Sequence, residues 1–215
     1  MRLLVCAATA NELAAWGTPT PETALLVSGV GVPATFSALA TPPTVLPKLI
    51  VNIGIAGAYP GSNLTIGDIV LGSSEVYGDL GFALPEPPYF RPITQSPFGD
   101  FYATPYPLWI PAQIDVPIGR GCTVSTCTGT DLQGHHRQEL YQAYFETMEG
   151  AAVAQIGAQW GVPVCEIRSI SNLAADRNMQ IENIRLSLKT LELFLNKTKN
   201  LFYKITEQGP YLLSS

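Results

Sequence analysis

The stretch Glu146–Ala152, which reads ETMEGAA, marks the point where a strand is expected to turn into a helix. Gly150, Ala151 and Ala152 are small residues that let a backbone pass close to a neighbouring group. Glu149 stands just before them, so its carboxylate falls at the junction between the strand and the helix. In open α/β folds such junctions lie at the edge of the sheet where ligands bind.

A carboxylate at this junction can accept two hydrogen bonds from a vicinal diol, such as the 2′- and 3′-hydroxyls of a ribose. The alternative for Glu149 is a solvated side chain at the start of a capped helix. The sequence therefore offers Glu149 as a candidate for binding a sugar, and the neighbouring segments have to decide between the two interpretations.

Short apolar runs alternate with helical patterns along the whole chain, and several of the runs are apolar on both faces, as strands covered on both sides should be. The expected strands are Leu3–Ala7, Ala24–Ser28, Leu49–Ile55, Asp68–Tyr77, Cys122–Cys127 and Val164–Ile170. The expected helices are Asn11–Trp16, Val32–Ala40, Asp131–Tyr144, Glu149–Trp160 and Ile181–Tyr203. This pattern predicts a three-layer α/β/α sandwich around a central, mixed but mostly parallel sheet.

Length and composition fit one domain spanning residues 1–215 with a sizeable core. Hydrophobic residues make up 47% of the chain and charged residues 13%. So little surface charge predicts that part of the surface is buried in a homo-oligomer, a dimer or larger. The net charge of −5 argues against a nucleic-acid partner. No apolar run approaches the roughly 18 residues of a membrane span.

The cysteines give no sign of a metal site or a disulfide framework. The chain has four, Cys6, Cys122, Cys127 and Cys165, without a CxxC pair or a histidine at ligand spacing. A reduced, cytoplasmic setting follows. The segment Met1–Leu13 is expected to be the first strand and turn of the fold, because its apolar run is too short and too interrupted for a signal peptide.

The segment Pro85–Pro117 differs from the rest of the chain because prolines and aromatic residues are dense in it. Proline at this density excludes a regular helix or a central strand. Aromatic residues at this density argue against disorder. We expect an ordered, extended excursion that packs on a subunit interface or over the site; the alternative is an ordinary long surface loop.

Three further segments accompany Glu146–Ala152. They are Ala8–Glu12 (ATANE), Asn52–Ala58 (NIGIAGA) with Ile66–Leu71 (IGDIVL), and Glu166–Arg177 (EIRSISNLAADR). In their order and spacing they resemble the nucleoside phosphorylase/nucleosidase superfamily, and most of all its hydrolase branch. Within that branch the combination of ETMEGAA and IRSISN is most similar to the futalosine hydrolases, nucleosidases of menaquinone biosynthesis. The resemblance covers roughly residues 1–80 and 120–195.

The resemblance implies a role for each matching residue. Glu12, just beyond the first strand, would position and deprotonate the attacking water; the alternative is an exposed glutamate in the first turn of a helix. Met148 and Glu149 would hold the ribose. Ala56, Gly57 and Ser171 would contact the substrate. Water would be the only co-substrate, so no metal and no organic cofactor are expected.

Two positions qualify this assignment. Arg168 matches an arginine that lies near the catalytic water and the acidic residues, and its alternative is a structural ion pair with Glu166 or Glu149. Ile55 departs from the pattern, because the adenine-specific nucleosidases carry a small hydroxyl residue there. An isoleucine side chain leaves that polar contact unfilled.

Asn172 is the most diagnostic residue. The adenine-specific nucleosidases have Ser-Asp where this chain has Ser171–Asn172, and their aspartate donates or shares a proton at N7 of the base. An amide cannot donate a proton of that acidity, but its N–H suits the O6 acceptor of a 6-oxopurine. Asn172 therefore favours hypoxanthine or guanine over adenine, and futalosine carries hypoxanthine. The alternative is that Asn172 caps the turn before Ala174–Asp176.

These residues predict hydrolysis of the N-glycosidic bond of a small purine nucleoside, with futalosine as the expected substrate. A methylthioadenosine/S-adenosylhomocysteine nucleosidase is the first alternative, and Asn172 argues against it. A purine nucleoside phosphorylase is the second, but Lys48 is the only basic residue between Thr9 and Thr65, where phosphate would bind. A non-catalytic nucleoside-binding protein is the alternative from another class.

Overall fold

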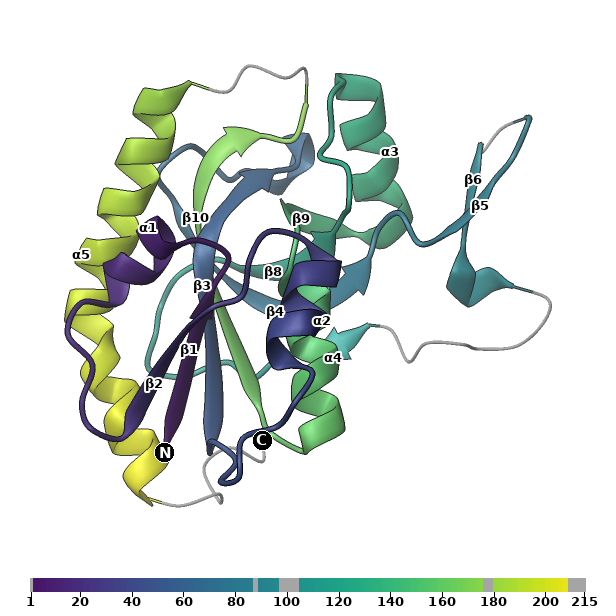
Figure 1. The fold of residues 1–215 in the computed structure, drawn as a ribbon. Helices are drawn as coiled ribbons and strands as arrows, with labels where there is room; N and C mark the ends of the chain where they lie inside the picture. The colour runs from purple at the N-terminus through teal and green to yellow at the C-terminus, as the bar shows by residue number, and fades with distance from the viewer. Residues whose placement is uncertain (1, 87–88, 97–104, 176–179, 209–215) are drawn as a thin grey trace.

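The computed structural model describes residues 2–86, 89–96, 105–175 and 180–208. Its centre is an eight-stranded sheet, and a separate pair of short strands forms a hairpin beside it (Figure 1). The strands of the central sheet are β1 (Leu3–Ala7), β2 (Thr23–Val27), β3 (Leu49–Ala58), β4 (Ile69–Tyr77), β7 (Tyr106–Pro107), β8 (Ile118–Thr123), β9 (Ala143–Thr147) and β10 (Val164–Leu173). The hairpin consists of β5 (Gly81–Ala83) and β6 (Phe90–Pro92).

Five α-helices and several short 3₁₀ turns join these strands in the described part of the chain. The helices are α1 (Ala10–Leu13), α2 (Val32–Leu39), α3 (Asp131–Tyr141), α4 (Gly150–Trp160) and α5 (Ile181–Gln208). The 3₁₀ turns are η1 (Ala14–Trp16), η2 (Pro60–Ser62) and η3 (Ile93–Gln95). The chain thus alternates strands and helices, as the sequence predicts.

The sheet is mixed, and it curls so far that β10, which pairs with β4 at one end of the path of strands, also pairs with β3. β1 pairs in parallel with both β2 and β3, and β8 does so with β4 and β9. β10 runs parallel to β3 on one side and antiparallel to β4 on the other. β9 runs antiparallel to β3 at its end. The predicted central, mixed sheet is confirmed, and its curl brings the ends of β3, β9 and β10 together.

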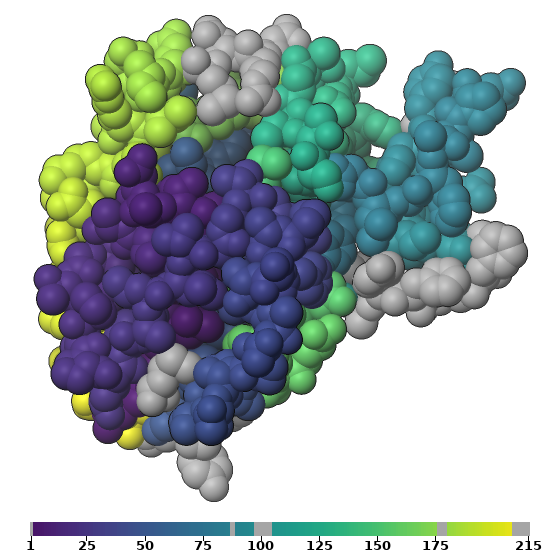
Figure 2. Space-filling model, viewed as in Figure 1, coloured from purple at the N-terminus to yellow at the C-terminus, as the bar shows by residue number. Residues whose placement is uncertain are grey.

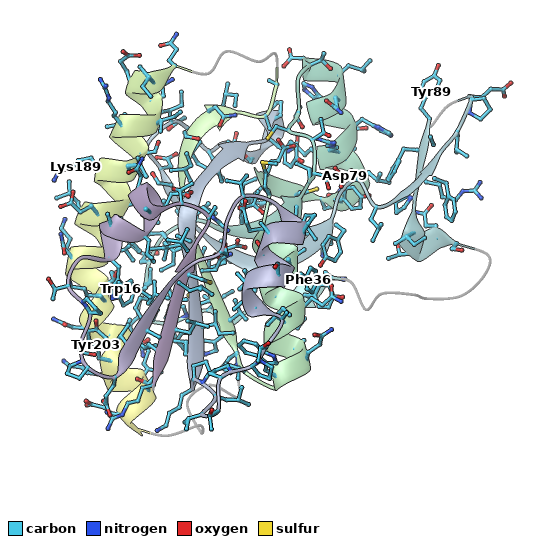
Figure 3. The ribbon with its side chains drawn as sticks, viewed as in Figure 1. Trp16, Phe36, Asp79, Tyr89, Lys189 and Tyr203 are labelled. Atoms are coloured by element: carbon cyan, nitrogen blue, oxygen red, sulfur yellow. The ribbon has the colours of Figure 1, made fainter. Side chains whose placement is uncertain are left out.

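Helices cover both faces of the sheet (Figure 1). On one face α5 packs over β10 and β3 together with η1, around buried residues such as Leu191, Leu195 and Phe202. There the indole of Trp16 donates a hydrogen bond to the Tyr203 hydroxyl at 3.3 Å (Figure 3). On the other face α2 and α4 pack against each other and enclose a second core. The predicted three layers are therefore present.

Most element boundaries differ from the sequence prediction by a few residues, and β3 and α5 extend beyond their predicted ends to Ala58 and Gln208. Two elements differ in a way that affects the fold. The predicted helix Asp131–Tyr144 ends at Tyr141, because Gln142 adopts a left-handed conformation with φ of 53°. The residues after it form β9, a strand that the sequence analysis missed. The predicted strand Cys122–Cys127 is wrong at both ends: β8 begins at Ile118 and ends at Thr123. Beyond Thr123 the Asp79 carboxylate accepts hydrogen bonds from the Ser125 and Thr126 amides, which bends the chain into a loop.

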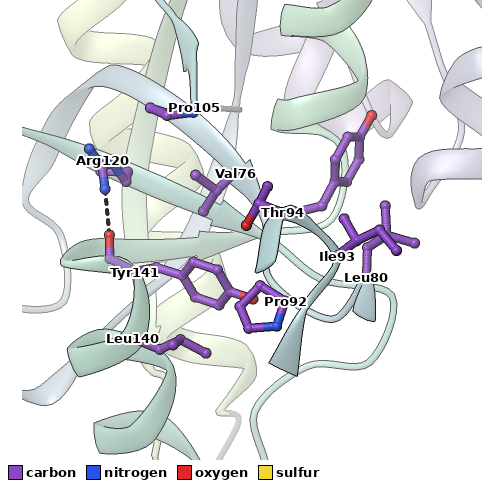
Figure 4. A pocket seen from close by; sticks show the side chains of 10 residues that line it. Val76, Leu80, Pro92, Ile93, Thr94, Pro105, Arg120, Leu140 and Tyr141 are labelled. Atoms are coloured by element: carbon purple, nitrogen blue, oxygen red, sulfur yellow. Dashed lines mark hydrogen bonds between the residues drawn. The ribbon is translucent and has the colours of Figure 1, made fainter. Parts of the chain in front are cut away.

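Part of the predicted excursion Pro85–Pro117 falls on residues 87–88 and 97–104, which lie outside the described residues. The described part contains β6, η3 and β7, all short, as proline-rich sequence predicts. The β5–β6 hairpin stands away from the main body (Figure 2), and Tyr89 lies near its tip (Figure 3). A cavity of about 150 Å³ separates η3 from the body, with Arg120 and Tyr141 in its wall (Figure 4).

Candidate active site

A cavity of about 420 Å³ opens where the C-terminal ends of β1, β3, β9 and β10 meet the start of α4. Parallel strands place ligand groups at this edge of a sheet. All of the site residues that the sequence predicts line this cavity, except Arg168. The predicted site residues that line the cavity are Glu12, Ala56, Gly57, Met148, Glu149, Ser171 and Asn172. Segments separated by up to 160 positions in the sequence thus meet at one cavity.

Glu12 is held by several hydrogen bonds just beyond the C-terminal end of β1. It is buried, and it is the third residue of α1, whose first turn is capped by Thr9. The Thr9 amide and hydroxyl donate to Oε2 of Glu12 at 3.0 and 2.7 Å, and the Ile55 amide donates to Oε1 at 3.0 Å. The alternative of an exposed first-turn glutamate is therefore wrong. Backbone and hydroxyl donors fix the carboxylate so that it faces the cavity.

These hydrogen bonds explain how the site tolerates an isoleucine at position 55, where the adenine-specific nucleosidases have a hydroxyl residue. The backbone amide of Ile55, which any residue except proline provides, makes the polar contact with Glu12. The carboxylate is therefore oriented without a hydroxyl side chain at position 55. The half-buried Ile55 side chain lines the cavity as an apolar wall.

Glu149 lies opposite, at the N-terminal end of α4, and is 6% exposed. Its Oε1 accepts a hydrogen bond from the Gly31 amide at 2.8 Å. Burial raises the pKa of Glu149, while Arg168 and the Gly31 amide act in the opposite direction. Glu149 lines the cavity, so its carboxylate can accept a hydrogen bond from a hydroxyl group of a ligand.

Arg168 lies behind the floor of the cavity and is fully enclosed. Its Nη2 and Nε atoms bind Oε1 of Glu166 at 2.8 and 3.0 Å. Burial alone would lower the pKa of Arg168, but Glu166, Glu149 and Glu12 together raise it. Of the alternatives that the sequence leaves open, the ion pair with Glu166 is present. The positive charge of Arg168 also acts on Glu149 and Glu12, two of the carboxylates that line the cavity.

Asn172 and Ser171 form one wall. The Ser171 hydroxyl donates to the side-chain oxygen of Asn172 at 2.9 Å, and the Asn172 amide donates to the Leu173 carbonyl at 3.0 Å. Asn172 pairs in register with Gly57, whose missing side chain leaves room for the Asn172 amide, because a methyl group there would lie 2.9 Å from Nδ2 of Asn172. One N–H of the Asn172 amide remains for a ligand, because an amide nitrogen carries two.

Glu146 is a cavity residue to which the sequence analysis assigned no role. Its carboxylate accepts hydrogen bonds from the Thr128 amide and hydroxyl and from the Tyr59 hydroxyl, and it forms a 3.0 Å ion pair with Arg137. Its register position, opposite Gly57 on β9, would have pointed to it if β9 had been recognised as a strand.

The other cavity residues without an assigned role come from loops, from helices and from the end of β9. Ile184 and Leu188 lie one turn apart on α5. Cys127 lies in the loop after β8, with its sulfur 3.6 Å from that of Met148. Thr9, Thr128 and Thr147 add hydroxyl groups to the wall. No sequence signal distinguished these residues from ordinary loop and core positions.

The charge of the cavity excludes one class of ligand. Glu12, Glu146 and Glu149 line it, and within the described residues its wall contains no lysine, arginine or histidine. A phosphate ion in this cavity would be repelled by the carboxylates and would lack a cationic partner. Across all the described residues, no cluster of three or more His, Cys, Asp or Glu side chains has an arrangement that could hold a metal ion. In the same part of the chain, no helix is long and apolar enough to cross a membrane.

Comparisons with known proteins agree with this geometry. The futalosine hydrolase of Streptomyces coelicolor is 31% identical over 66% of this chain and 61% of its own length. A 5′-methylthioadenosine/S-adenosylhomocysteine nucleosidase of Arabidopsis thaliana is 27% identical over 72% of this chain and 58% of its own length. The matches thus span about three fifths of the length of these relatives.

Solved structures share the fold. That of the Helicobacter pylori 5′-methylthioadenosine/S-adenosylhomocysteine nucleosidase superposes with a TM-score of 0.69 at 16% identity, covering 96% of this chain and 97% of that one. The family model of the phosphorylase superfamily matches residues 20–206, which include all the strands of the central sheet except β1. The chain therefore belongs to the phosphorylase superfamily.

Proposed function

We propose that this protein hydrolyses the N-glycosidic bond of a purine nucleoside and that its substrate is futalosine, which it splits into hypoxanthine and dehypoxanthine futalosine. The observation that carries the proposal is the placement of Glu12 and Glu149 on one cavity whose described wall has no cation. The futalosine hydrolase and nucleosidases among the relatives support the same reaction class.

In this mechanism Glu149 accepts hydrogen bonds from the ribose hydroxyls, and Met148 packs on the sugar. Glu12 holds a water molecule and takes a proton from it as the water oxygen bonds to C1′. The bond between C1′ and N9 breaks, and its electron pair leaves with the base, which takes up a proton. Asn172 donates an N–H to the 6-oxopurine and so stabilises the departing base. Arg168 acts from behind the floor, without touching the substrate.

Hydrolysis is favoured over phosphorolysis by charge. The described wall of the cavity offers three carboxylates and no cationic group, so water rather than phosphate is the nucleophile that fits beside Glu12.

A methylthioadenosine-type nucleoside is the second candidate substrate, and one observation favours it. Ile184, Leu188 and Val30 give the cavity an apolar side, and the described lining has no cation for a carboxylate at the far end of a substrate tail. An uncharged thioether tail suits this surface. Asn172 favours a 6-oxopurine, so the base and the tail point to different substrates.

The test is an assay of the purified protein with futalosine, aminofutalosine, methylthioadenosine and inosine, each with and without phosphate. We expect futalosine to be split fastest, free ribose-side product to accumulate and phosphate to have no effect. Faster turnover of methylthioadenosine would replace futalosine by the second candidate. A phosphate requirement with release of a sugar phosphate would overturn hydrolysis, and binding without turnover of any nucleoside would overturn catalysis.

We further propose that the protein is a cytoplasmic homo-oligomer. The cysteines are free, which suits a reducing compartment. No described residue of the Pro85–Pro117 segment lines the cavity, so we assign this segment to a subunit interface rather than to a cover over its own site. Sedimentation of the protein as a monomer, with rapid proteolysis inside the segment, would contradict this assignment.

A further inference from the structure

Two carboxyl groups lie buried behind the floor of the cavity, and the hydrolytic mechanism does not use either. Glu75 on β4 is 0% exposed, and Glu166 on β10 is 1% exposed. The hydroxyls of Thr123 and Thr147 donate to Glu75 at 2.9 and 3.2 Å. Oε1 of Glu166 binds Arg168, but its Oε2 has no donor in the described structure when both groups are ionised. Buried polar atoms without a partner are rare and need an explanation.

Glycines on three elements leave the space in which these two groups meet. A methyl group on Gly150 would lie 2.2 Å from Oε1 of Glu75 and 2.7 Å from Oε1 of Glu166. One on Gly121 would lie 2.1 Å from Glu75, and one on Gly72 would lie 2.8 Å from Oε2 of Glu166. The two carboxyl groups therefore occupy one enclosed space from which water is excluded.

The charges in this space do not balance if every carboxyl group is ionised. Arg168 pairs with Glu166 and also attracts Glu149 and Glu12, so its single charge is already shared. Two carboxylates in contact in a dry environment cannot both remain ionised. Burial, followed by the charge of Glu166 and a hydrogen bond with it, raises the pKa of Glu75 well above its usual range.

We propose that Glu75 is a neutral carboxylic acid that donates its proton to the carboxylate of Glu166, and that this pair is the positioning device for Arg168. Glu75 is the protonated partner because its contacts are hydroxyls, which serve as donors or acceptors, whereas Glu166 faces the guanidinium of Arg168. The shared proton leaves Glu166 with one net negative charge to hold Arg168 beneath the cavity.

The positioning role rests on the proposed hydrolase activity, whereas the protonation of Glu75 does not. If Glu75 ionised, its charge would repel Glu166 and compete for Arg168, and the positive potential under Glu12 and Glu149 would weaken. The groups that act on Glu75 are Glu166 and Arg168 from β10, Thr123 and Cys122 from β8, and Thr147 from β9.

The first test is infrared spectroscopy of the full chain without substrate. A protonated carboxylic acid has a carbonyl stretch that is separate from the bands of carboxylates. We expect this band in the wild type at pH 7 and its loss in Glu75→Gln. Glu149→Gln, which removes the other buried carboxyl group with a raised pKa, is the matched control and should retain the Glu75 band. Absence of the band in the wild type, or its persistence in Glu75→Gln, would overturn the proposal.

The second test compares turnover in two variants at position 75. The Gln side chain keeps an N–H donor toward Glu166, whereas Ala leaves Glu166 with only the Arg168 and Asn52 donors to its Oε1. Glu75→Gln should therefore lose only a few-fold in kcat and Glu75→Ala about a hundredfold. Equal losses in the two variants would refute the positioning role. Lack of turnover by the wild type on every nucleoside, with the infrared band present, would refute the proposed function and leave the proton-sharing pair intact.

Discussion

Glu12 and Arg168 approach each other across Gly54, and the absent side chain of that glycine makes the approach possible. A methyl group at this position would lie 2.6 Å from Oε1 of Glu12 and 2.3 Å from Nη1 of Arg168. The position of Glu12, the proposed general base, thus depends on Gly54, which has no side chain and takes no part in the reaction.

Gly54→Ala should therefore damage activity more than stability. The added methyl group has to displace either the carboxylate or the guanidinium, and overpacking of this kind costs about 1–3 kcal/mol of unfolding free energy. We expect kcat/KM to fall by at least about a hundredfold, as a misplaced catalytic group does. Base release and thermal melting measure the two effects. Gly129→Ala is the matched control, because nothing lies within 4 Å of the added methyl group there.

Glu12→Gln should abolish most turnover while the fold persists. Glutamine in the third position of a helix still completes the capping box with Thr9, but it cannot take a proton from water. We expect kcat to fall about 10²–10⁴-fold, with substrate binding retained in calorimetry. The exposed Glu192, which pairs with Lys189 on α5, provides the control Glu192→Gln. Turnover of the Glu12 variant close to wild type would remove Glu12 from the mechanism.

Glu149 should give the reaction an acid limb in its pH profile. Its two oxygens both act as full acceptors for hydroxyl groups only when the group is ionised, and burial raises its pKa above the ordinary value of 4.5. We expect kcat/KM to fall as the pH drops through this raised pKa, and Glu149→Gln to raise KM and remove the limb.

The same shift has a consequence for stability. Because the pKa is higher in the folded protein, the contribution of Glu149 to stability is present below 4.5 and is lost as the pH rises through the folded-state value. Glu149→Gln should therefore melt no lower than the wild type at pH 7. A variant that retains the acid limb, or melts well below the wild type, would contradict this account.

Asn172→Asp should change the choice of base. The Asn172 amide offers an N–H to O6 of a 6-oxopurine, whereas an aspartate presents a second acceptor there and suits a 6-amino group. A mismatched buried polar pair costs about 1–3 kcal/mol, so the specificity ratio should shift roughly tenfold or more. Competition between futalosine and aminofutalosine measures it. A wild type that prefers the amino substrate, or an unchanged ratio in the variant, would show that Asn172 does not read the base.

Arg137→Gln should destabilise the protein through Glu146. The pair is buried, and removing the arginine leaves a carboxylate in the cavity wall without its charge partner. Breaking such a pair costs about 3–5 kcal/mol. Arg2 supplies the contrast, since its ion pairs with Glu22 and Glu207 are exposed and Arg2→Gln should cost no more than about 1 kcal/mol. Chemical denaturation compares the two, and equal losses would refute the distinction.

The sequence predicted the layers and most of the cavity because both follow from local patterns. β1 is buried along its whole length, as its apolar run LLVCA predicts, and the segments around Glu12, Gly57, Glu149 and Asn172 were identifiable from short motifs at strand ends. What could not be predicted depends on distant contacts. The end of α3 at Gln142 and the loop fixed by Asp79 determine where β9 begins and where β8 stops, and no local pattern shows either.

Glu146 and Glu75 show the same limit for the site. A glutamate within a strand gives no sign, from sequence alone, of which partner will neutralise it. Glu146 forms an ion pair with Arg137 on the preceding helix. Glu75 instead lies against Glu166, a second carboxyl group on a strand some ninety positions later. The partner of each of these carboxyl groups is therefore determined by how the curled sheet brings distant strands together.

The bonds between Thr9 and Glu12 also affect how this protein would behave in a mutational library. The same carboxylate closes the first helical turn and faces the cavity, so a screen that sorts variants by cellular abundance and one that sorts them by growth will both penalise most substitutions at position 12. Only glutamine should separate the two screens, because it keeps the turn closed. A position at which a single substitution scores well for abundance and poorly for growth would then identify the general base without structural information.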